Sequence, residues 1–354
     1  MVNKVLKWIL LFSPIAYTTG LQLNKFDITF FKLGVITLFI ASLFDKQVRE
    51  LSKEIVYTIV SLMALCFIGL YIHKFSIVIL SAYINLSFAI VLLTILIRYV
   101  TDVKQFYKYI IIAGAINIVL FTLQRFGIDL IFNSNITPGF EGGLIGNGPR
   151  LIIYLTLILP IMFSKNILLS IPIIAVGLIM REYSFLPIIP LVVFYKLSKL
   201  VHKKILIPVF SIMCVLIVCL FYKEISTPIY HRFVIWSYSL KLLLQYPSMG
   251  YGLGSFPVVI TGYMENVNLS FPFMSAYNDY LEFLVGVGLL GVGWLVYVSK
   301  IIIRYFKFNL QTIILFSMLI LMSFEYPLEI PRLWFTIVFI IASFIIVNYQ
   351  ERRI

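Results

Sequence analysis

The chain has 354 residues, of which 61% are hydrophobic and only 12% are charged, and its mean hydropathy is +1.03. These values exclude an ordinary soluble domain and predict an all-α, polytopic membrane helix bundle. The formal net charge of +13 does not indicate nucleic-acid binding, because the Lys and Arg residues follow the loops between apolar runs.

Apolar runs near the length that a bilayer core requires recur from one end of the chain to the other. We expect about twelve transmembrane helices within a single integral membrane domain, 1–354. In chain order the runs are 5–22, 28–44, 55–72, 76–97, 107–126, 149–164, 166–180, 182–198, 204–222, 278–299, 309–325 and 331–348. Those within 149–198 are short and interrupted by proline, which favours kinked or re-entrant helices there.

Basic residues gather in the loops on the side shared by both termini, as in the cluster from Lys196 to Lys204, and are sparser on the opposite side. The positive-inside rule therefore places both termini in the cytoplasm. It also places the two longest loops, 127–148 and 223–277, on the outer face, the second of them between spans 9 and 10. A long loop that carries Arg, Trp, Asn and Asp beside the bilayer suggests a functional site.

The two outer loops differ in character. Loop 127–148 is rich in Gly, Asn and Pro, which favours turns and a segment that folds back over a membrane cavity. Loop 223–277 opens with apolar residues at helical spacing from about 228 to 246. This pattern predicts an amphipathic helix in the membrane interface, with Trp236 at headgroup depth.

Three alternating glycines, Gly250, Gly252 and Gly254, follow this helix. Their spacing does not fit a dinucleotide-binding loop, and no strand precedes them. They predict a tight, irregular turn that lies close to other backbone or to a ligand.

Half of the arginines fall on the outer side, where topology disfavours cations. A guanidinium binds phosphate through two parallel hydrogen bonds, which an ammonium cannot do. These arginines are therefore candidate anion-binding groups: Arg125, Arg150, Arg181, Arg232 and Arg332.

Each of the main candidates also has a structural interpretation. Arg181 lies between two apolar runs with no real loop around it. A charge near the hydrocarbon core costs free energy, so a charged residue there is often functional. The alternative is that Arg181 pairs with Glu182 at the membrane boundary. Arg150 is at a helix start that could help to hold an anion, or is a surface charge. Arg332 follows a proline and lies near Glu325 and Glu329, which suggests an ion-paired helix start.

Few residues in the outer segments are suited to proton transfer. His231 precedes Arg232 in the large loop and is a candidate catalytic or substrate-contacting group. Asp279 and Glu282 are three residues apart and share a helix face, where the alternative role of Asp279 is to cap the helix. The sequence contains no metal-ligand spacing, P-loop or Ser-His-Asp arrangement, so we expect no metal and no cofactor.

Several short motifs follow one another after span 9. They are Arg232-x-x-x-Trp236, the glycine turn from Pro247 to Phe256, the pair Asn278 and Leu281, and Gly288-x-x-Gly291. This series resembles the O-antigen ligase and O-antigen polymerase superfamily of bacterial membrane glycosyltransferases, best from about 228 to 345. Segment 324–331 resembles the outer turn before the last span of that family, and segments 146–154 and 180–182 are more weakly similar to its upstream motifs. The N-terminal third matches only in hydrophobicity.

The resemblance implies transfer of a glycan from an undecaprenyl-pyrophosphate carrier to a sugar hydroxyl, with inversion, on the outer face of the bacterial cytoplasmic (inner) membrane. It implies that Arg181 and Arg232 bind the leaving diphosphate, whose negative charge grows in the transition state. Further substrate-binding candidates are Arg150, Trp236, Asn278, Glu282 and Arg332. The implied partners are the lipid-linked donor, an acceptor that is either lipid-linked glycan or lipid A-core, membrane lipids and a chain-length regulator, with no nucleic acid.

One departure from the family concerns the residue before Asn278. The family ligases carry His there, to engage the acceptor hydroxyl, whereas this chain carries Tyr277. A phenol with a pKa near 10 is a poor general base at neutral pH. Either Tyr277 orients the acceptor while His231, Asp279 or Glu282 takes the proton, or the step needs little base assistance, and the assignment shifts from ligase toward polymerase.

Three alternatives to a polymerase stand beside it. A ligase of the same fold would attach finished glycan to a lipid or protein acceptor. A transporter or flippase of lipid-linked oligosaccharide would need ionisable or broken-helix signals at the bilayer midplane and internal repeats, of which the sequence shows only Lys32 inside a span. A purely structural membrane protein would not need the long outer loop.

Overall fold

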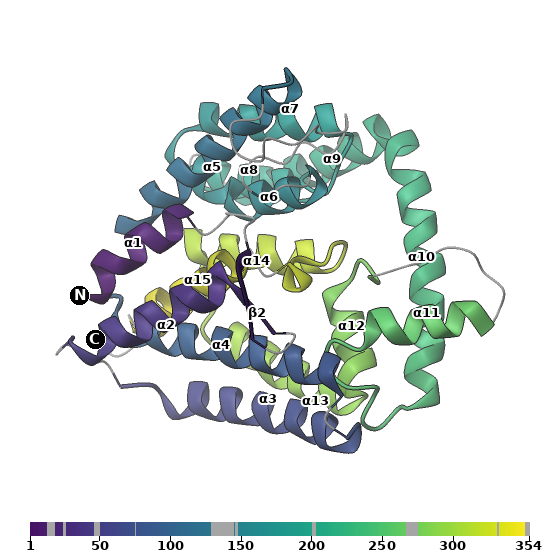
Figure 1. Ribbon diagram of the computed structural model, residues 1–354. Helices are drawn as coiled ribbons and strands as arrows, with labels where there is room; N and C mark the ends of the chain where they lie inside the picture. The colour runs from purple at the N-terminus through teal and green to yellow at the C-terminus, as the bar shows by residue number, and fades with distance from the viewer. Residues whose placement is uncertain are drawn as a thin grey trace.

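The computed structural model describes residues 1–12, 18–23, 26–45, 50–74, 76–128, 145, 148–199, 203–266, 275–330 and 333–350. Over these residues the protein is a helical bundle with one short β-hairpin (Figure 1). The helices are α1 (Val2–Phe12), α2 (Phe30–Leu43), α3 (Lys53–Ile72), α4 (Ile77–Tyr99), α5 (Lys104–Arg125), α6 (Gly148–Lys165), η2 (Ile167–Ser170), α7 (Ile171–Met180), α8 (Ile188–Leu197), α9 (Lys203–Leu220), α10 (Tyr222–Gln245), α11 (Phe256–Asn266), α12 (Asp279–Val287), α13 (Leu290–Arg304), α14 (Leu310–Met322), η3 (Pro327–Glu329) and α15 (Trp334–Gln350).

The hairpin corrects the first predicted span, 5–22. Helix α1 ends at Phe12, and strands β1 (Thr18–Leu23) and β2 (Phe26–Thr29) pair antiparallel, with Thr18 opposite Thr29. The segment that enters the hairpin contains two threonines and a glycine, which favour extended backbone over a helix interior. Because residues 5–22 are mostly apolar, hydrophobicity alone does not reveal where the helix ends and the hairpin begins.

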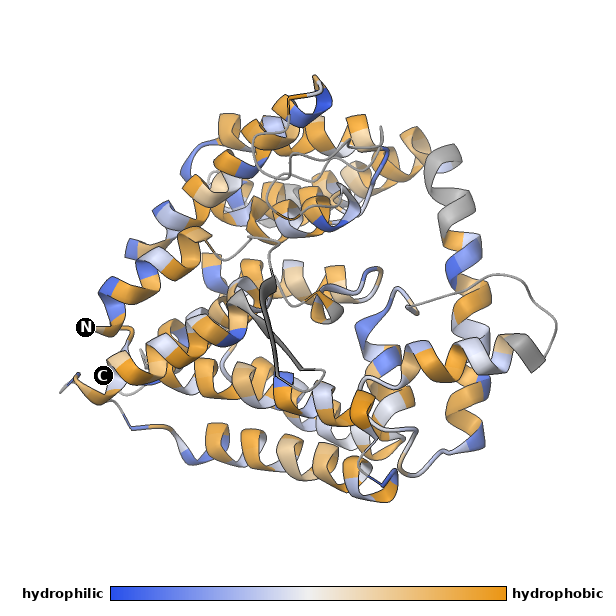
Figure 2. Ribbon diagram, viewed as in Figure 1, coloured by the Kyte–Doolittle hydropathy of each residue, from blue (hydrophilic) through white to orange (hydrophobic). Residues whose placement is uncertain are grey.

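Four of the described helices are long and apolar enough to cross a membrane: α3, α4, α5 and α6. Many large apolar side chains are exposed along the described helices, and in Figure 2 hydrophilic residues gather mostly at helix ends. This pattern is typical of a protein whose outer surface meets lipid. The assignment of the shorter helices as spans, and the total of about twelve, stay predictions.

The predicted span 278–299 is also corrected, because it is two helices. Gly288 separates α12 from α13 with a φ of 72°, in the left-handed region that favours glycine. A Cβ at Gly288 would lie 2.5 Å from the carbonyl carbon of Ser248, so the backbone of the glycine turn occupies the space beside the break.

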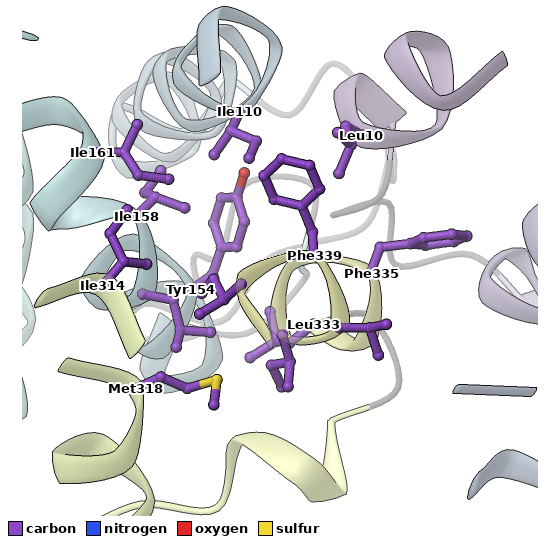
Figure 3. Close-up of a cluster of buried hydrophobic side chains, with 14 of the residues drawn as sticks. Leu10, Ile110, Tyr154, Ile158, Ile161, Ile314, Met318, Leu333, Phe335 and Phe339 are labelled. Carbon is purple, nitrogen blue, oxygen red and sulfur yellow. The ribbon is translucent and has the colours of Figure 1, made fainter. Parts of the chain in front are cut away.

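The core is built around α6, α14 and α15. Helix α6 packs on α14, α14 packs on α15, and α15 packs on α4. Almost every side chain of α6 is buried, and Figure 3 shows Tyr154 and Ile158 of α6 close to Phe339 of α15 and Met318 of α14. Of the helices that meet at the candidate site, α14 belongs to this core, whereas the buried side chains of α10 and α12 form a second cluster with those of α11.

Helix α10 runs across the direction of α3, α4 and α13, at the end of the bundle away from the two termini (Figure 1). It contacts α11 and α12 there. The helix predicted for about 228–246 is therefore confirmed as a helix, with an earlier start at Tyr222. Its position in a membrane interface stays a prediction.

Candidate functional site

The candidate site lies where α10 meets the polar turns at the ends of α12 and α14. Three side chains form its centre: Arg232 from α10, Glu325 from the turn after α14, and Tyr277 from the segment before α12. These residues are far apart in sequence, and the crossing of α10 over the helix ends brings them together.

Arg232 and Glu325 form a buried ion pair. The Nη2 of Arg232 donates to Oε1 of Glu325 at 2.7 Å, and the two side chains are 19% and 7% exposed. A charge that loses its partner in such a setting typically costs about 3–5 kcal/mol. The hydrogen bond therefore holds the two side chains in position against each other.

Tyr277 lies against the same guanidinium. Its ring centroid is 5.5 Å from the Arg232 Cζ, within the range of a cation–π contact, and its ring is edge-on to that of Tyr326 at 5.2 Å. Tyr277 has a φ of 51°, a left-handed conformation that is unfavourable for a tyrosine. The surrounding contacts must therefore hold this backbone in place.

Two of the predicted substrate-binding residues, Glu282 and Trp236, supply those contacts. Glu282 Oε1 accepts from the Ser275 hydroxyl at 2.5 Å and from the Ala276 N–H at 2.6 Å, and Trp236 Nε1 donates to the Ala276 carbonyl at 2.8 Å. The Ser275 hydroxyl in turn accepts from the Tyr277 N–H at 3.0 Å. Both residues thus position Tyr277, and their contact with substrate stays a prediction.

Asn278 and Asp279 are likewise bonded to backbone. The Asn278 side chain caps α12 by accepting from the Leu281 N–H at 3.0 Å, and it donates to the Ser323 carbonyl at 3.2 Å. Asp279 is buried and accepts from the Leu328 N–H at 3.2 Å. The two side chains therefore tie the start of α12 to the turn that carries Glu325.

Further charges surround the ion pair. Burial raises the pKa of Glu325 to about 7, because desolvation and the nearby Glu182 carboxylate outweigh the opposing effect of Arg232. Burial likewise raises the pKa of Glu182, again against the effect of Arg232. Burial raises the pKa of Tyr326 to about 12, while a hydrogen bond from Arg150 lowers it. Arg150 and Arg232 are therefore both close to this group of carboxyl and phenol side chains.

Two of the remaining predicted residues, Arg181 and His231, are exposed next to members of the cluster, and the third, Arg332, is not among the described residues. Arg181 is exposed at the end of α7, with a φ of 55°, and it is the next residue, Glu182, that interacts with Arg232. His231 is exposed, with its ring beside that of Tyr230. Arg332 lies outside the described residues, so its predicted role and its pairing near Glu325 stay predictions.

The glycine turn confirms the expectation of close backbone contact. Gly250, Gly252 and Gly254 all have positive φ, and the N–H groups of Tyr251 and Gly252 donate to the carbonyls of Val285 and Gly286 at 2.9 and 2.7 Å. The turn therefore clamps the end of α12 rather than forming an open loop. His73 contributes a ring-nitrogen hydrogen bond to the Gly250 carbonyl at 3.1 Å.

Sequence reasoning missed Glu325 and Tyr326 as members of the site. Both lie in segment 324–331, which had been singled out as an outer turn, and Glu325 had been assigned to a helix start beside Arg332. The sequence feature that could have identified Glu325 is its position on the outer side, because a carboxylate that is buried there needs a cationic partner.

The cluster combines two guanidinium groups with carboxyl and phenol groups. Guanidinium groups suit the binding of phosphate oxygens, and a carboxyl whose pKa is about 7 suits proton transfer at neutral pH. Within the described part of the chain, no group of three or more His, Cys, Asp or Glu side chains is placed to hold a metal ion.

A separate hollow lies between α3 and α13. It is wide, mostly apolar and lined by Tyr57, Ser61, Leu65, Leu290, Trp294 and Tyr297. None of these residues belongs to the Arg232 cluster, so the hollow is distinct from the charged site.

Comparison with known proteins identified no relative of this chain. No known family model matches the chain, and no curated protein matches it. Any assignment therefore depends on the motifs that the chain carries and on the chemistry of the Arg232 cluster.

Proposed function

We propose that this protein is a membrane glycosyltransferase that polymerises oligosaccharide repeat units from an undecaprenyl-pyrophosphate-linked donor. In this proposal the helices form about twelve spans in the bacterial cytoplasmic membrane, with both termini in the cytoplasm. The Arg232 cluster then faces outward, and the product is a cell-envelope polysaccharide of the O-antigen or capsule type.

The observation that carries the proposal is the mostly buried guanidinium of Arg232, placed among groups that can move a proton. Cleavage of a sugar–diphosphate bond develops negative charge on the leaving phosphate, and a preorganised guanidinium in a poorly hydrated site stabilises that charge. Arg150, beside Tyr326, is a second cation in the same group of side chains. The motif resemblance around Arg232 and Trp236 agrees with this role.

The apolar outer surface supports the lipid nature of the donor. A carrier with a long isoprenoid tail needs a site that it can reach from the bilayer, and α10, which carries Arg232, also exposes the apolar side chains of Phe233, Leu240 and Leu244. The donor therefore keeps its tail in lipid while its diphosphate reaches Arg232.

A polymerase is favoured over a ligase because of Tyr277. Its ring contacts the Arg232 guanidinium, so in this chain the position of the ligase histidine belongs to the diphosphate side of the site. The acceptor is accordingly another lipid-linked glycan rather than lipid A-core.

The test is a transfer assay with the purified full chain in lipid nanodiscs. The substrate is the lipid-linked repeat unit extracted from a strain that lacks this gene, and chain growth is followed by mass spectrometry. We expect the wild type to lengthen the glycan and Arg232→Ala to abolish transfer. Arg304→Ala is the matched control, because Arg304 also pairs with a glutamate, Glu54, but is 62% exposed and lies at the opposite end of α13 from the cluster.

Equal polymer formation by Arg232→Ala and the wild type would remove Arg232 from the site. Arg181→Ala in the same assay tests whether the exposed arginine takes part, as the motif resemblance implies. Cells that lack the gene separate the reactions: a single repeat on the acceptor indicates a polymerase, polymer stranded on its carrier indicates a ligase, and units trapped inside indicate a flippase.

A further inference from the structure

Glu325 is the carboxyl group that shares its cation with the proposed substrate. Its side chain is 7% exposed, and its Oε1 accepts from the same Arg232 guanidinium that the proposed function assigns to the diphosphate. A bound diphosphate and Glu325 would both place negative charge on that guanidinium. The ion pair seen here is therefore the arrangement before donor binding.

We propose that Glu325 accepts the proton of the attacking sugar hydroxyl, and that binding of the donor diphosphate to Arg232 frees Glu325 to do so. This inference rests on the proposed function and adds to it the general base that Tyr277 cannot readily supply. Donor binding and activation of the acceptor are thereby coupled through one guanidinium.

The bonding changes are those of an inverting displacement. The acceptor oxygen forms a bond to the anomeric carbon as its O–H bond breaks, and the proton passes to a Glu325 carboxylate oxygen. The bond between the anomeric carbon and the phosphate oxygen breaks, and its electron pair leaves with the carrier diphosphate, which Arg232 holds. Glu325 then returns the proton to water and pairs with Arg232 again.

The other candidate bases are already engaged. Asp279 accepts from the Leu328 N–H, and Glu282 accepts from Ser275 and Ala276. His231 is exposed beside Tyr230. Of the described carboxyl groups, Glu325 and Glu182 both interact with Arg232, and Glu325 is the one that accepts its hydrogen bond, which an incoming anion can take over.

The charged groups around Glu325 favour its acceptance of a proton once the donor is bound. Arg232 on α10 favours its ionised form, whereas Glu182 after α7 raises its pKa, and Asp279 on α12 and Tyr326 also interact with it electrostatically. Tyr277 contacts the Arg232 guanidinium and the Tyr326 ring, and Arg150 acts through Tyr326. When a diphosphate neutralises Arg232, the neighbouring carboxylates remain, and Glu325 gains proton affinity.

The experiment compares Glu325→Gln with the wild type in two measurements on the full chain. Binding of undecaprenyl diphosphate in nanodiscs reports the Arg232 side, and transfer from the lipid-linked repeat unit reports proton removal. We expect Glu325→Gln to bind undecaprenyl diphosphate at least as tightly as the wild type while its kcat falls by roughly 10²–10⁴-fold, the usual contribution of a general base. Glu54→Gln is the control, because Glu54 pairs with an exposed arginine away from the cluster.

The dependence of kcat on pH distinguishes a general base from a residue with a structural role, because a structural role of Glu325 would not change that dependence. The wild-type kcat should fall as the pH drops below the pKa of Glu325 in the donor complex, whereas the residual rate of Glu325→Gln should not show that limb. Glu325→Asp should retain the limb with a lower rate. Retained binding of undecaprenyl diphosphate also shows that the variants are folded.

The outcomes separate this inference from the proposed function. A wild type that neither binds undecaprenyl diphosphate nor transfers glycan refutes the proposed function. A wild type that transfers, together with a Glu325→Gln variant of equal kcat, refutes the inference alone. Loss of diphosphate binding in Glu325→Gln would also refute it, because it would show that Glu325 only positions Arg232.

Discussion

Gly250 provides the sharpest test of how the glycine turn holds the site. Replacement by alanine adds a Cβ that would lie 2.6 Å from the Gly286 carbonyl carbon and closer still to the Val285 carbonyl oxygen. These are backbone atoms, which cannot rotate away as a side chain can. The residue also has a φ of 63°, which alanine adopts poorly.

The expected loss of stability is the sum of three effects. The left-handed backbone costs alanine about 1–2 kcal/mol. Overpacking in a close-packed region costs about 1–3 kcal/mol more. If the turn moves away, the hydrogen bonds from Tyr251 and Gly252 to α12 weaken, at about 1 kcal/mol each. Since these effects partly replace one another, we expect Gly250→Ala to lower the free energy of unfolding by about 3–5 kcal/mol.

The assay is equilibrium unfolding of purified variants in mixed detergent micelles. Two other glycines separate the cost of the left-handed backbone from the cost of overpacking. Gly127 has a φ of 79° with nothing within 4 Å of an added Cβ, and an added Cβ at Gly262 in α11 would also have nothing within 4 Å. Gly127→Ala should therefore lose only about 1–2 kcal/mol, and Gly262→Ala should be neutral or gain up to about 1 kcal/mol. A loss at Gly250 no larger than at Gly127 would refute the claim that close backbone contact fixes this turn.

Three further predictions concern the ion pair and its supports. Burial raises the pKa of Glu325 above its ordinary value of 4.5, so the folded state holds this proton more tightly than the unfolded state. The stability that this carboxyl contributes should therefore be fully present below about pH 4.5 and should decline up to about pH 7. Glu325→Gln should remove up to about 1.4 kcal/mol per pH unit of that slope, and identical slopes would contradict the burial of the carboxyl. Tyr277→Phe keeps the ring over Arg232 and should transfer glycan at close to the wild-type rate, whereas a large fall in kcat would show that the phenol moves the proton. Trp236→Phe removes the bond to the Ala276 carbonyl and should lower the free energy of unfolding by about 1 kcal/mol, as measured by the same unfolding assay; no change would indicate that the indole does not hold segment 275–277.

Local patterns predicted much of the helical framework. Helices α3 to α6 begin and end within about three residues of the predicted runs, because turns and charged residues flank those runs directly. The amphipathic spacing of apolar residues around Trp236 predicted α10, and the alternating glycines predicted a turn in contact with backbone. Each of these features depends on residues close together in sequence.

Features that depend on distant contacts were not predicted. Arg232 and Glu325 are 93 positions apart, and only the crossing of α10 over the helix ends makes them neighbours. The sequence interpretation paired Glu325 with Arg332 because that residue is near in the chain. Likewise, the break at Gly288 reflects the glycine turn packed beside it, which hydrophobicity alone does not reveal.

Phe221 alone separates α9 from α10, and the chain changes direction at this single non-helical residue (Figure 1). Helix α9 leaves most of its described side chains exposed and packs mainly on α8, and its 18 residues correspond to about 27 Å. In a bilayer, packing on α8 would set the inclination of such a helix, and a mismatch with the acyl-chain length would change it at a modest cost. Under the proposed function, a change in membrane thickness that tilts α9 would also move α10 and Arg232, and lipid composition would then affect how readily the protein binds its lipid-linked donor.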